Sequence, residues 1–243
     1  MLAFARFELR RSVRDTRFLF FLWAMPAAFY MLLARLGHAG SLQGLPRPEA
    51  LMVAMIAYAT MGSALYGIGP PLAQERANHW IRQLRVMPLT GWQWLTAKVA
   101  QGALLALPGA VIVAVIAAAG HGVGASPGAW AGLAVLVTVG SVPFSALGLV
   151  VGQALDGQAS NTATLFLTIS LAVIGGLLVP VSLLPGPIHH LAHALPSYQL
   201  AATGRAVLDG TGIDAVGIAV LAIWTLAAVV IAWVLWRRHG AAG

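Results

Sequence analysis

The chain contains no cysteine and very little charge. Without cysteine it has no disulfide framework, no thiolate nucleophile and no cysteine-built zinc or iron–sulfur site. Only 9% of its 243 residues are charged, whereas a soluble globular domain carries about 25%. The mean hydropathy is +0.84. So few charges cannot cover a water-facing surface, and the composition therefore predicts an integral membrane protein.

Ionisable residues are missing from the middle of every long apolar run. Ion-coupled carriers and proton relays need such groups at membrane depth, because the coupling ion must bind there. Their absence argues against a proton- or sodium-coupled carrier and against an intramembrane hydrolase with a histidine base. We expect no hydrolase nucleophile and find no H-E-x-x-H zinc motif. G-x-x-x-x-G-K-[ST] is also missing, so the chain cannot cradle ATP phosphates itself.

Long apolar runs dominate what is present. A helix needs about 20 apolar residues to cross the hydrocarbon core. Six segments qualify: 18–36, 51–73, 99–119, 129–152, 162–184 and 215–236. Backbone polar groups in lipid must be satisfied within their own segment, so we expect an all-α, polytopic protein of six transmembrane helices.

The basic residues predict the orientation, because Lys and Arg accumulate in cytoplasmic flanks. Eleven of the 14 lie before the first segment, between the second and third, or after the sixth. The other three are Arg35, Arg47 and Arg205. This split predicts cytoplasmic N- and C-termini and accounts for the net charge of +7, so we expect no nucleic-acid partner. A signal peptide cleaved near residues 37–39 is the alternative for the start, but its apolar run exceeds the usual length of about 7–15 residues.

A polar run, "ERANHWIRQLRVMP", separates the second and third segments. Its apolar residues follow helical spacing, at Ala77, Trp80, Ile81 and Leu84. Glu75 would lie in the first turn and Arg85 in the last, as the helix dipole favours. Pro88 would end the helix. We therefore expect an amphipathic helix of about three turns outside the hydrocarbon; an interfacial helix that only anchors topology is the alternative.

Two stretches resemble ABC-2-type permeases. The cytoplasmic segment of that family commonly reads "ER…G…L…TP(L/V)S…GK". The matching residues here are Glu75-Arg76, Leu84, Met87-Pro88-Leu89-Thr90 and Lys98. The run "GGLLVPVSLLPGPIHHLAHALPSYQLAATGRAVLDG", 175–210, resembles the end of the family's fifth span, with Pro180, Leu184-Pro185, Pro196 and Arg205. One departure is Ala77-Asn78, where the family often has glycine.

The resemblance implies an ABCG-like exporter fold with one transmembrane domain, 1–243. Within it lie an N-terminal amphipathic helix, 1–17, a cytoplasmic coupling segment, 74–98, and an extracytoplasmic re-entrant segment with short helices, 185–214. It implies a dimer with a second copy or a paralogue, in the lipids of the cell (cytoplasmic) membrane. ATP and Mg would be held by a separate ATPase subunit, with no cofactor and no enzymatic activity on this chain. The implied function is efflux of an amphiphilic or apolar substrate, such as a drug, antibiotic, peptide or lipid-like molecule.

The resemblance also assigns candidate site residues. The ATPase-docking residues of the coupling helix would be Glu75, Arg76, Trp80, Arg82, Leu84, Arg85 and Pro88. An N-terminal helix would add a basic face of Arg6, Arg10, Arg14 and Arg17, for which attraction to anionic lipid is the alternative. The candidate substrate path is Tyr58, Met61, Tyr66, Phe166, Thr168 and Leu171, for which plain packing is the alternative.

Three histidines precede the sixth segment. His189 and His193 are spaced as a possible metal pair, but no third ligand is close in sequence, so we expect no metal site. These histidines are also the only group that would suit a membrane-embedded enzyme. Two functions therefore compete with transport: such an enzyme, and a membrane scaffold that relays ATPase motion to partners without transporting anything.

Overall fold

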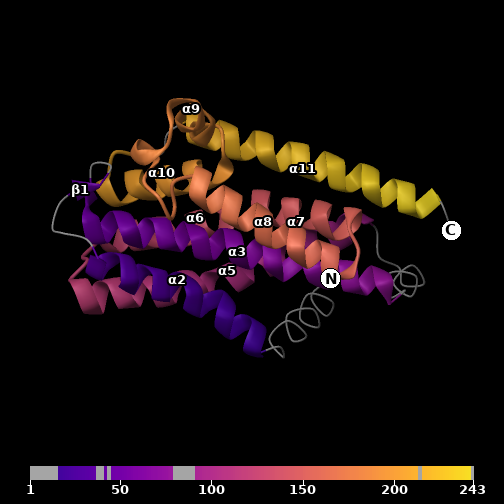
Figure 1. Ribbon diagram of the computed structural model, residues 1–243, viewed down its shortest axis with the longest axis horizontal. Coiled ribbons are helices and arrows are strands. Elements are labelled where there is room, and N and C mark those ends of the chain that lie inside the picture. Colours follow the sequence, from indigo (N-terminus) through magenta and orange to yellow (C-terminus); the bar gives the residue numbers. More distant parts are fainter. Residues whose placement is uncertain (1–15, 37–40, 43–44, 79–90, 213–214, 242–243) are drawn as a thin grey trace.

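The computed structural model describes residues 16–36, 41–42, 45–78, 91–212 and 215–241. These residues form a bundle of long helices that reverse direction along the chain, except that α7 continues in the direction of α6 (Figure 1). The long helices are α2 (Thr16–Leu36), α3 (Arg47–Ala77), α5 (Gly91–His121), α6 (Pro127–Gly140), α7 (Val142–Ala154), α8 (Gly157–Ile174) and α11 (Ala215–Ala241). The shorter elements are β1 (Ser41–Leu42), β2 (Leu45–Pro46), η1 (Val181–Leu183), α9 (Gly186–His193) and α10 (Pro196–Asp209).

Five stretches of the described helices are long and apolar enough to cross a membrane. They are Arg47–Ala77, Thr96–His121, Pro127–Ala154, Gly157–Ile174 and Ala215–Arg237. The first predicted span coincides with α2, whose apolar stretch Leu22–Arg35 is shorter. The all-α, multi-pass prediction is therefore confirmed, and the count of six spans stays a prediction.

Helix α3 forms the centre of the bundle. It is apolar on all sides, so it can be buried on all sides, and 89% of its most apolar stretch is buried. It packs against α2, α5, α7, α8 and α10. By contrast, α11 lies along one edge against α7 and α10 (Figure 1). Only 11% of its most apolar stretch is buried. The protein therefore presents α11 to its surroundings and hides α3.

Small residues let α7 approach α3 closely. A Cβ on Gly152 would stand 2.6 Å from the carbonyl oxygen of Gly69. One turn earlier, a Cβ on Gly148 would stand 3.2 Å from the carbonyl oxygen of Leu65. On the same helix, Ser145 lies against Gly102 of α5. Backbones at this separation exclude any larger side chain, as in close helix packing within membranes.

The charged residues with described side chains gather at the two ends of the bundle. We call one the Lys98 end: it contains the end of α3, the start of α5, the α7–α8 connection and the end of α11 (Figure 1). The other is the Arg205 end, with β1, β2, the start of α3, the end of α5, α9 and α10 (Figure 1). Between the two ends, the described part of each long helix is uncharged, as a hydrocarbon layer requires.

The predicted fifth segment, 162–184, is wrong at both ends. Helix α8 starts at Gly157 and stops at Ile174. Gly176 has a φ of 74°, and the amides of Gly176 and Leu177 donate to the carbonyls of Val173 and Ala172. This is a Schellman cap, which favours glycine at the left-handed position. The apolar residues after it form a turn and the helix η1 instead of continuing the span.

Two other boundaries also differ from the prediction. The second segment was expected to end at Ala73, but α3 continues to Ala77, so Glu75 lies in its last turn. The expected separate helix therefore does not begin at Glu75. The fourth segment is broken at Ser141 into α6 and α7, two residues before Pro143, because proline removes a backbone hydrogen bond.

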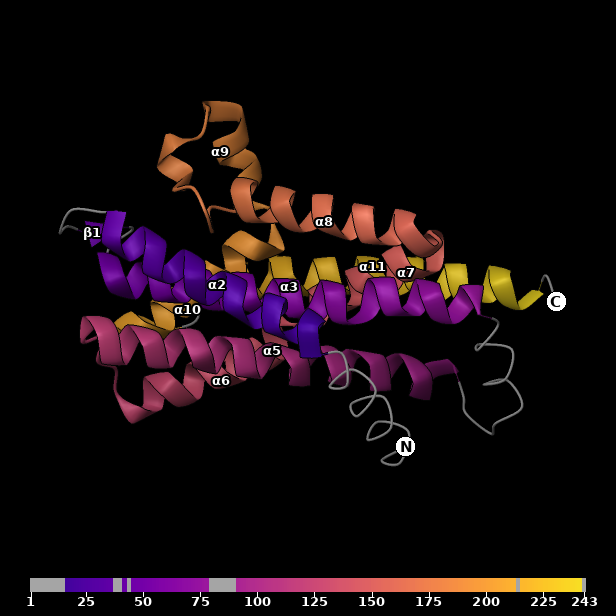
Figure 2. The same ribbon diagram turned by 60° about the horizontal axis from the view of Figure 1, so that its bottom comes forward.

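Two short helices, α9 and α10, occupy the region predicted to hold a helix pair. Helix α9 stands away from the bundle beside the end of α8, whereas α10 packs into it (Figure 2). Ser197 of α10 donates to the carbonyl of Leu171 at 2.8 Å, which ties α10 to α8. Trp224 of α11 donates to the carbonyl of Ala194 at 2.8 Å. These bonds fix the connection between α9 and α10 to two long helices.

Candidate functional site

A groove of about 280 Å³ opens between α2, α3 and α8. Its walls are Leu22, Met25, Tyr58, Gly62, Tyr66, Leu165, Thr168 and Ile169. Thr168 donates its hydroxyl to the carbonyl of Thr164 at 2.8 Å, so this hydroxyl is satisfied within its own helix. The groove therefore offers an apolar surface with a few polar atoms, the usual composition of a small-molecule site.

The α3 wall of the groove is a row of residues four apart. Tyr58, Gly62 and Tyr66 lie one above another on the same side of the helix. Gly62 leaves space between the two tyrosines, and a Cβ there would come within 3.9 Å of Leu22. The ring of Tyr58 also packs edge-on against Phe29 of α2, with centroids 6.0 Å apart. This aromatic contact holds one side of the groove in place.

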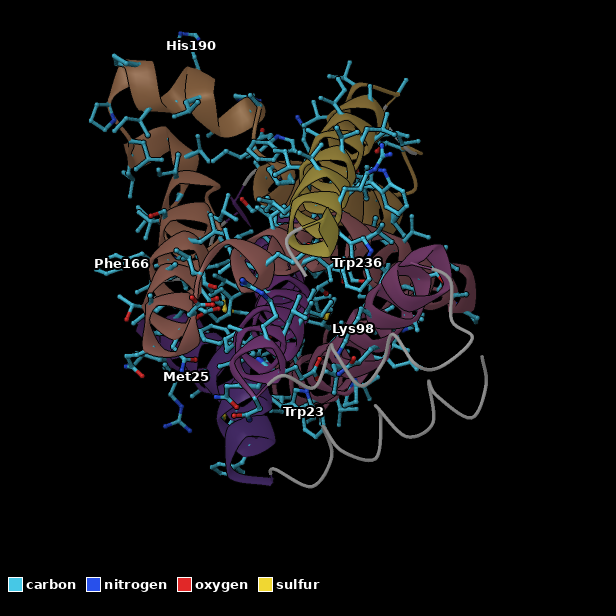
Figure 3. The ribbon with its side chains drawn as sticks, turned by 90° about the vertical axis from the view of Figure 1, so that its right-hand side faces the viewer. Trp23, Met25, Lys98, Phe166, His190 and Trp236 are labelled. Carbon is cyan, nitrogen blue, oxygen red and sulfur yellow. The ribbon has the colours of Figure 1, made fainter. Side chains whose placement is uncertain are left out.

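The groove gathers three of the six candidate path residues: Tyr58, Tyr66 and Thr168. Met61 and Leu171 are buried in the packed core. Phe166 is 66% exposed and points away from the bundle (Figure 3). The sequence could have suggested Gly62, which continues the four-residue spacing from Tyr58. No sequence pattern indicated that Leu22 and Met25 line the groove, because their positions depend on how α2 packs against α3.

The Lys98 end contains a buried ion pair. Lys98 of α5 donates to both carboxylate oxygens of Glu75, each at 3.1 Å. Both side chains are only 1% exposed. In Figure 3, Lys98 lies among the helices of this end, not on its outer face. The pair joins α3 to α5 at the two ends of the polar connection between them.

Arg76 holds the α7–α8 connection. Its Nη1 donates to the carbonyl oxygens of Gly152, at 3.2 Å, and Gln153, and lies 3.5 Å from that of Leu155. It also forms an ion pair at 3.4 Å with Asp156, which is 78% exposed. The last carbonyls of a helix lack intrahelical donors, and Arg76 supplies one. This guanidinium therefore ties the end of α3 to the turn that starts α8.

The structure thus gives Glu75 and Arg76 partners inside the chain. The other predicted docking residues, Trp80, Arg82, Leu84, Arg85 and Pro88, lie outside the described residues. So do Arg6, Arg10 and Arg14, and of Arg17 only the backbone, in the first turn of α2, is described. The docking assignments accordingly stay predictions. Lys98 belongs to the motif that resembles the family, but its pairing with Glu75 across 23 positions was not predicted.

The histidines lie together on α9. The ring centroids of His189 and His193 are 5.2 Å apart, and that of His193 is 4.4 Å from Tyr198. His190 points outward (Figure 3). In the described part of the chain, no group of three or more His, Asp or Glu residues is placed to hold a metal ion. The arrangement is an aromatic cluster that joins α9 to α10.

One serine lies in a hydrolase-like pattern that our expectation of no hydrolase nucleophile overlooked. Residues 124–128 match G-x-S-x-G, the pattern of a nucleophile elbow. An elbow requires a strand before the serine, but Ser126 follows a turn and caps α6. Its Oγ accepts from the amide of Ala129 at 3.1 Å. Ser126 is therefore a helix cap, a common role for serine at this position.

Comparison with known proteins agrees with this architecture. The family described as "ABC-2 family transporter protein" matches residues 44–236, which include α3 and α8 of the groove and both residues of the buried ion pair. The chain is also 23% identical over 203 residues to "Putative transport permease YvfS" of Bacillus subtilis (strain 168). That alignment covers 84% of this chain and 83% of the relative. From the family match and the apolar helical bundle together, the chain belongs to the ABC-2 transporter family and is a multi-pass transport permease.

Proposed function

We propose that this permease is the transmembrane subunit of an ATP-driven exporter in the cytoplasmic membrane. It would have six spans and cytoplasmic termini, and a separate ATPase subunit would hold ATP and Mg. The substrate would be an amphiphilic or apolar molecule, such as a drug, antibiotic, peptide or lipid-like compound. The observation that carries this proposal is the groove between α2, α3 and α8, which is uncharged and lined by apolar and aromatic side chains.

The groove opens sideways among exposed apolar residues. Met25 of α2 and Leu165 of α8 line it, and their side chains are about half exposed. The side chain of Phe166, next to the groove, is more exposed than either. A second permease placed against α2 and α8 would cover this face and convert two grooves into one central path. This arrangement supports a dimer, with either the same chain or a paralogue. Lipid would contact the remaining apolar surface, above all that of α11.

The Lys98 end offers a route for mechanical coupling. We propose that the segment 79–90 docks on the ATPase through Arg82 and Arg85. Any force on this segment would move α3 and α5 together, because Glu75 and Lys98 join the ends of the two helices that flank it. Arg76 would pass the movement to the start of α8. Since α8 forms a wall of the groove, closure of the ATPase dimer would change the shape of the groove.

Charge reversal tests the docking proposal. The double variant Arg82→Glu with Arg85→Glu should release the ATPase subunit from the detergent-solubilised complex, because the cationic contact becomes anionic. The matched control is Arg35→Glu, which reverses an exposed arginine at the other end of the bundle and should leave the complex intact. Measured co-purification that stays unchanged in the double variant would mean that the docking surface is elsewhere.

Two assays separate transport from its competitors. In proteoliposomes with the ATPase, the permease should move a fluorescent amphiphile in an ATP-dependent way, whereas a scaffold should not. An enzyme built on the histidine cluster should lose activity in the variant His189→Ala with His193→Ala. A permease should keep its transport rate in that variant, because neither histidine lines the groove.

A further inference from the structure

Arg205 is half buried, and it has no acidic partner among the residues that the structure describes. In the described part of the chain, no carboxylate or carbonyl oxygen is bonded to its guanidinium, whose Cζ lies 5.8 Å from the centroid of the Tyr198 ring. Asp209 lies one turn further along α10, but no ion pair of described residues joins the two. Partial burial removes some of the water around the guanidinium, and this favours an anion that replaces it. Arg205 therefore differs from Arg76 and Lys98, whose charges are met within the chain.

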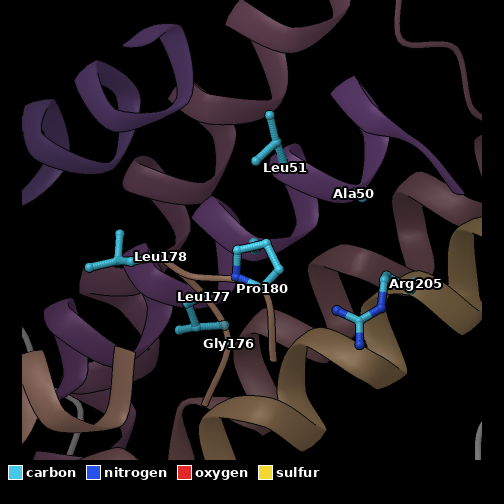
Figure 4. A pocket seen from close by; sticks show the side chains of 8 residues that line it. Ala50, Leu51, Gly176, Leu177, Leu178, Pro180 and Arg205 are labelled. Carbon is cyan, nitrogen blue, oxygen red and sulfur yellow. The ribbon is translucent and has the colours of Figure 1, made fainter. Parts of the chain in front are cut away.

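The guanidinium faces a small cavity at the Arg205 end. The cavity measures about 40 Å³ and lies between α3, α10 and the turn after α8. Apart from Arg205 its walls are Ala50, Leu51, Ala54, Gly176, Leu177, Leu178 and Pro180. Figure 4 shows the Arg205 side chain extending from α10 toward Pro180. A space of this size holds roughly three water-sized groups, which suits a carboxylate or part of a phosphate.

The cavity and the groove share one row of α3. Ala50 and Ala54 line the cavity, and Tyr58, Gly62 and Tyr66 line the groove, all at intervals of four residues. Four residues span about 6 Å of helix, so the cavity begins one turn beyond the groove. The row from Tyr66 to Ala50 rises about 24 Å along the helix and winds about 160° around it. Across from α3, the groove is bounded by α8, and the cavity is bounded by the turn that follows α8.

A second arginine reinforces the positive charge at this end. Arg47 precedes Ala50 and Leu51 by three and four positions, so it lies on the same side of α3, one turn nearer the end. Its Nε is buried and has no partner among the described residues. Burial also lowers the pKa of Arg205, although an arginine remains cationic. The end of the α3 row is therefore apolar, with Arg47 and Arg205 near it and one acid, Glu49, in the same turn of α3.

We infer that Arg205 forms an anion site that receives the acidic group of an amphiphile whose apolar body follows the α3 row. The chemistry is that of a carboxylate or phosphate on a long apolar chain, carried either by the transported molecule or by a resident phospholipid. The planar guanidinium suits both groups, because it can donate two parallel hydrogen bonds. Identifying the occupant as cargo rests on the proposed transport function, whereas the anion site itself does not.

Equilibrium binding of a matched pair of probes tests the site. The full chain is placed in nanodiscs of neutral phosphatidylcholine and titrated with fluorescent cis-parinaric acid or its methyl ester. Saturable energy transfer from tryptophan reports binding. The wild type should bind the acid at least about tenfold more tightly than the ester. Arg205→Gln should bring the acid to the level of the ester. Arg205→Lys should keep part of the preference, because the charge remains.

The controls are Arg35→Gln, an exposed arginine at the same end, and Asp209→Asn, an exposed acid on the same helix. Both should keep the wild-type preference. An equal affinity of the wild type for acid and ester would overturn the inference, whatever the stability of the variants. So would a full acid preference in Arg205→Gln. Doping the nanodiscs with anionic phosphatidylglycerol identifies the source: competition with the acid indicates a lipid headgroup, and no competition indicates a free acid.

Failure of the transport proposal would look different. Acid binding that depends on Arg205, without ATP-dependent movement in proteoliposomes, would leave the anion site standing and reject transport. Transport of neutral amphiphiles, together with equal binding of acid and ester, would support the transport function and reject the anion site.

Discussion

The two ends of the bundle treat charge in opposite ways. At the Lys98 end, Glu75 and Lys98 neutralise each other in the interior, and Arg76 is bonded to carbonyls and to Asp156. At the Arg205 end, an arginine faces an apolar cavity and has no carboxylate or carbonyl partner among the described residues. Charges that are paired within the chain hold neighbouring helices together, whereas a charge without an internal partner can bind a ligand. We therefore propose mechanical coupling for the Lys98 end and ligand binding for the Arg205 end.

The largest expected effect would come from breaking the buried ion pair. Glu75→Gln leaves the Lys98 ammonium buried beside a neutral amide, which should lower the free energy of unfolding by about 3–5 kcal/mol. Thermal unfolding in detergent micelles measures the loss. The double variant Glu75→Leu with Lys98→Met is the control and should recover most of it, because it removes both charges. A mild effect of Glu75→Gln would mean that water reaches this pair and that the ends differ less than we argue.

An intermediate effect is expected from Gly152→Ala, which tests how tightly the Lys98 end is packed. The new Cβ would meet the carbonyl oxygen of Gly69 at 2.6 Å, so α3 and α7 must separate. Overpacking of this kind costs about 1–3 kcal/mol. Gly120→Ala near the Arg205 end is the matched control: nothing lies within 4 Å of its Cβ position. That control should be neutral or slightly stabilising, and equal losses in both variants would contradict the difference in packing.

The smallest effect on stability should follow Arg205→Gln. Its described contact is the cation–π interaction with Tyr198, worth about 0.5–1 kcal/mol at a partly exposed site. The same unfolding assay, with Arg35→Gln as reference, measures it. A loss as large as that of Glu75→Gln would show that Arg205 serves an internal structural role. The contrast between the two ends would then disappear.

Much of the architecture could be predicted from the sequence because hydropathy acts locally. Long apolar runs located α3, α5, α6 with α7, and α11 to within about five residues at each boundary, except that α5 starts eight residues before its predicted boundary. One error arose where a local signal was given too little weight, and another where no local signal exists. Gly175-Gly176 ended α8 ten residues before the predicted boundary, and the sequence contained that glycine pair. The extension of α3 to Ala77 depends on burial of Glu75, which no local pattern reveals.

The candidate site was predicted only in part, for a geometric reason. The family resemblance supplied Tyr58, Tyr66 and Thr168, which do line the groove. It also supplied Met61 and Leu171, whose side chains turn into the core. Choosing between neighbouring positions on a uniformly apolar helix requires the packing of its partners. The cavity at Arg205 depends on three segments far apart in sequence, so the isolated arginine could not reveal it.

The modest length of α8 has a consequence for the membrane that surrounds the protein. Its 18 residues span about 27 Å, slightly less than a typical hydrocarbon thickness of about 30 Å. Helices α3 and α5, with 31 residues each, span about 46 Å. In a thicker bilayer, the capped end of α8 and the nearby Arg205 would lie closer to the acyl chains. In a thinner bilayer, they would lie closer to the headgroups. Hydrophobic mismatch should therefore tune this permease, and lipids of different chain length should alter its rate before they alter its fold.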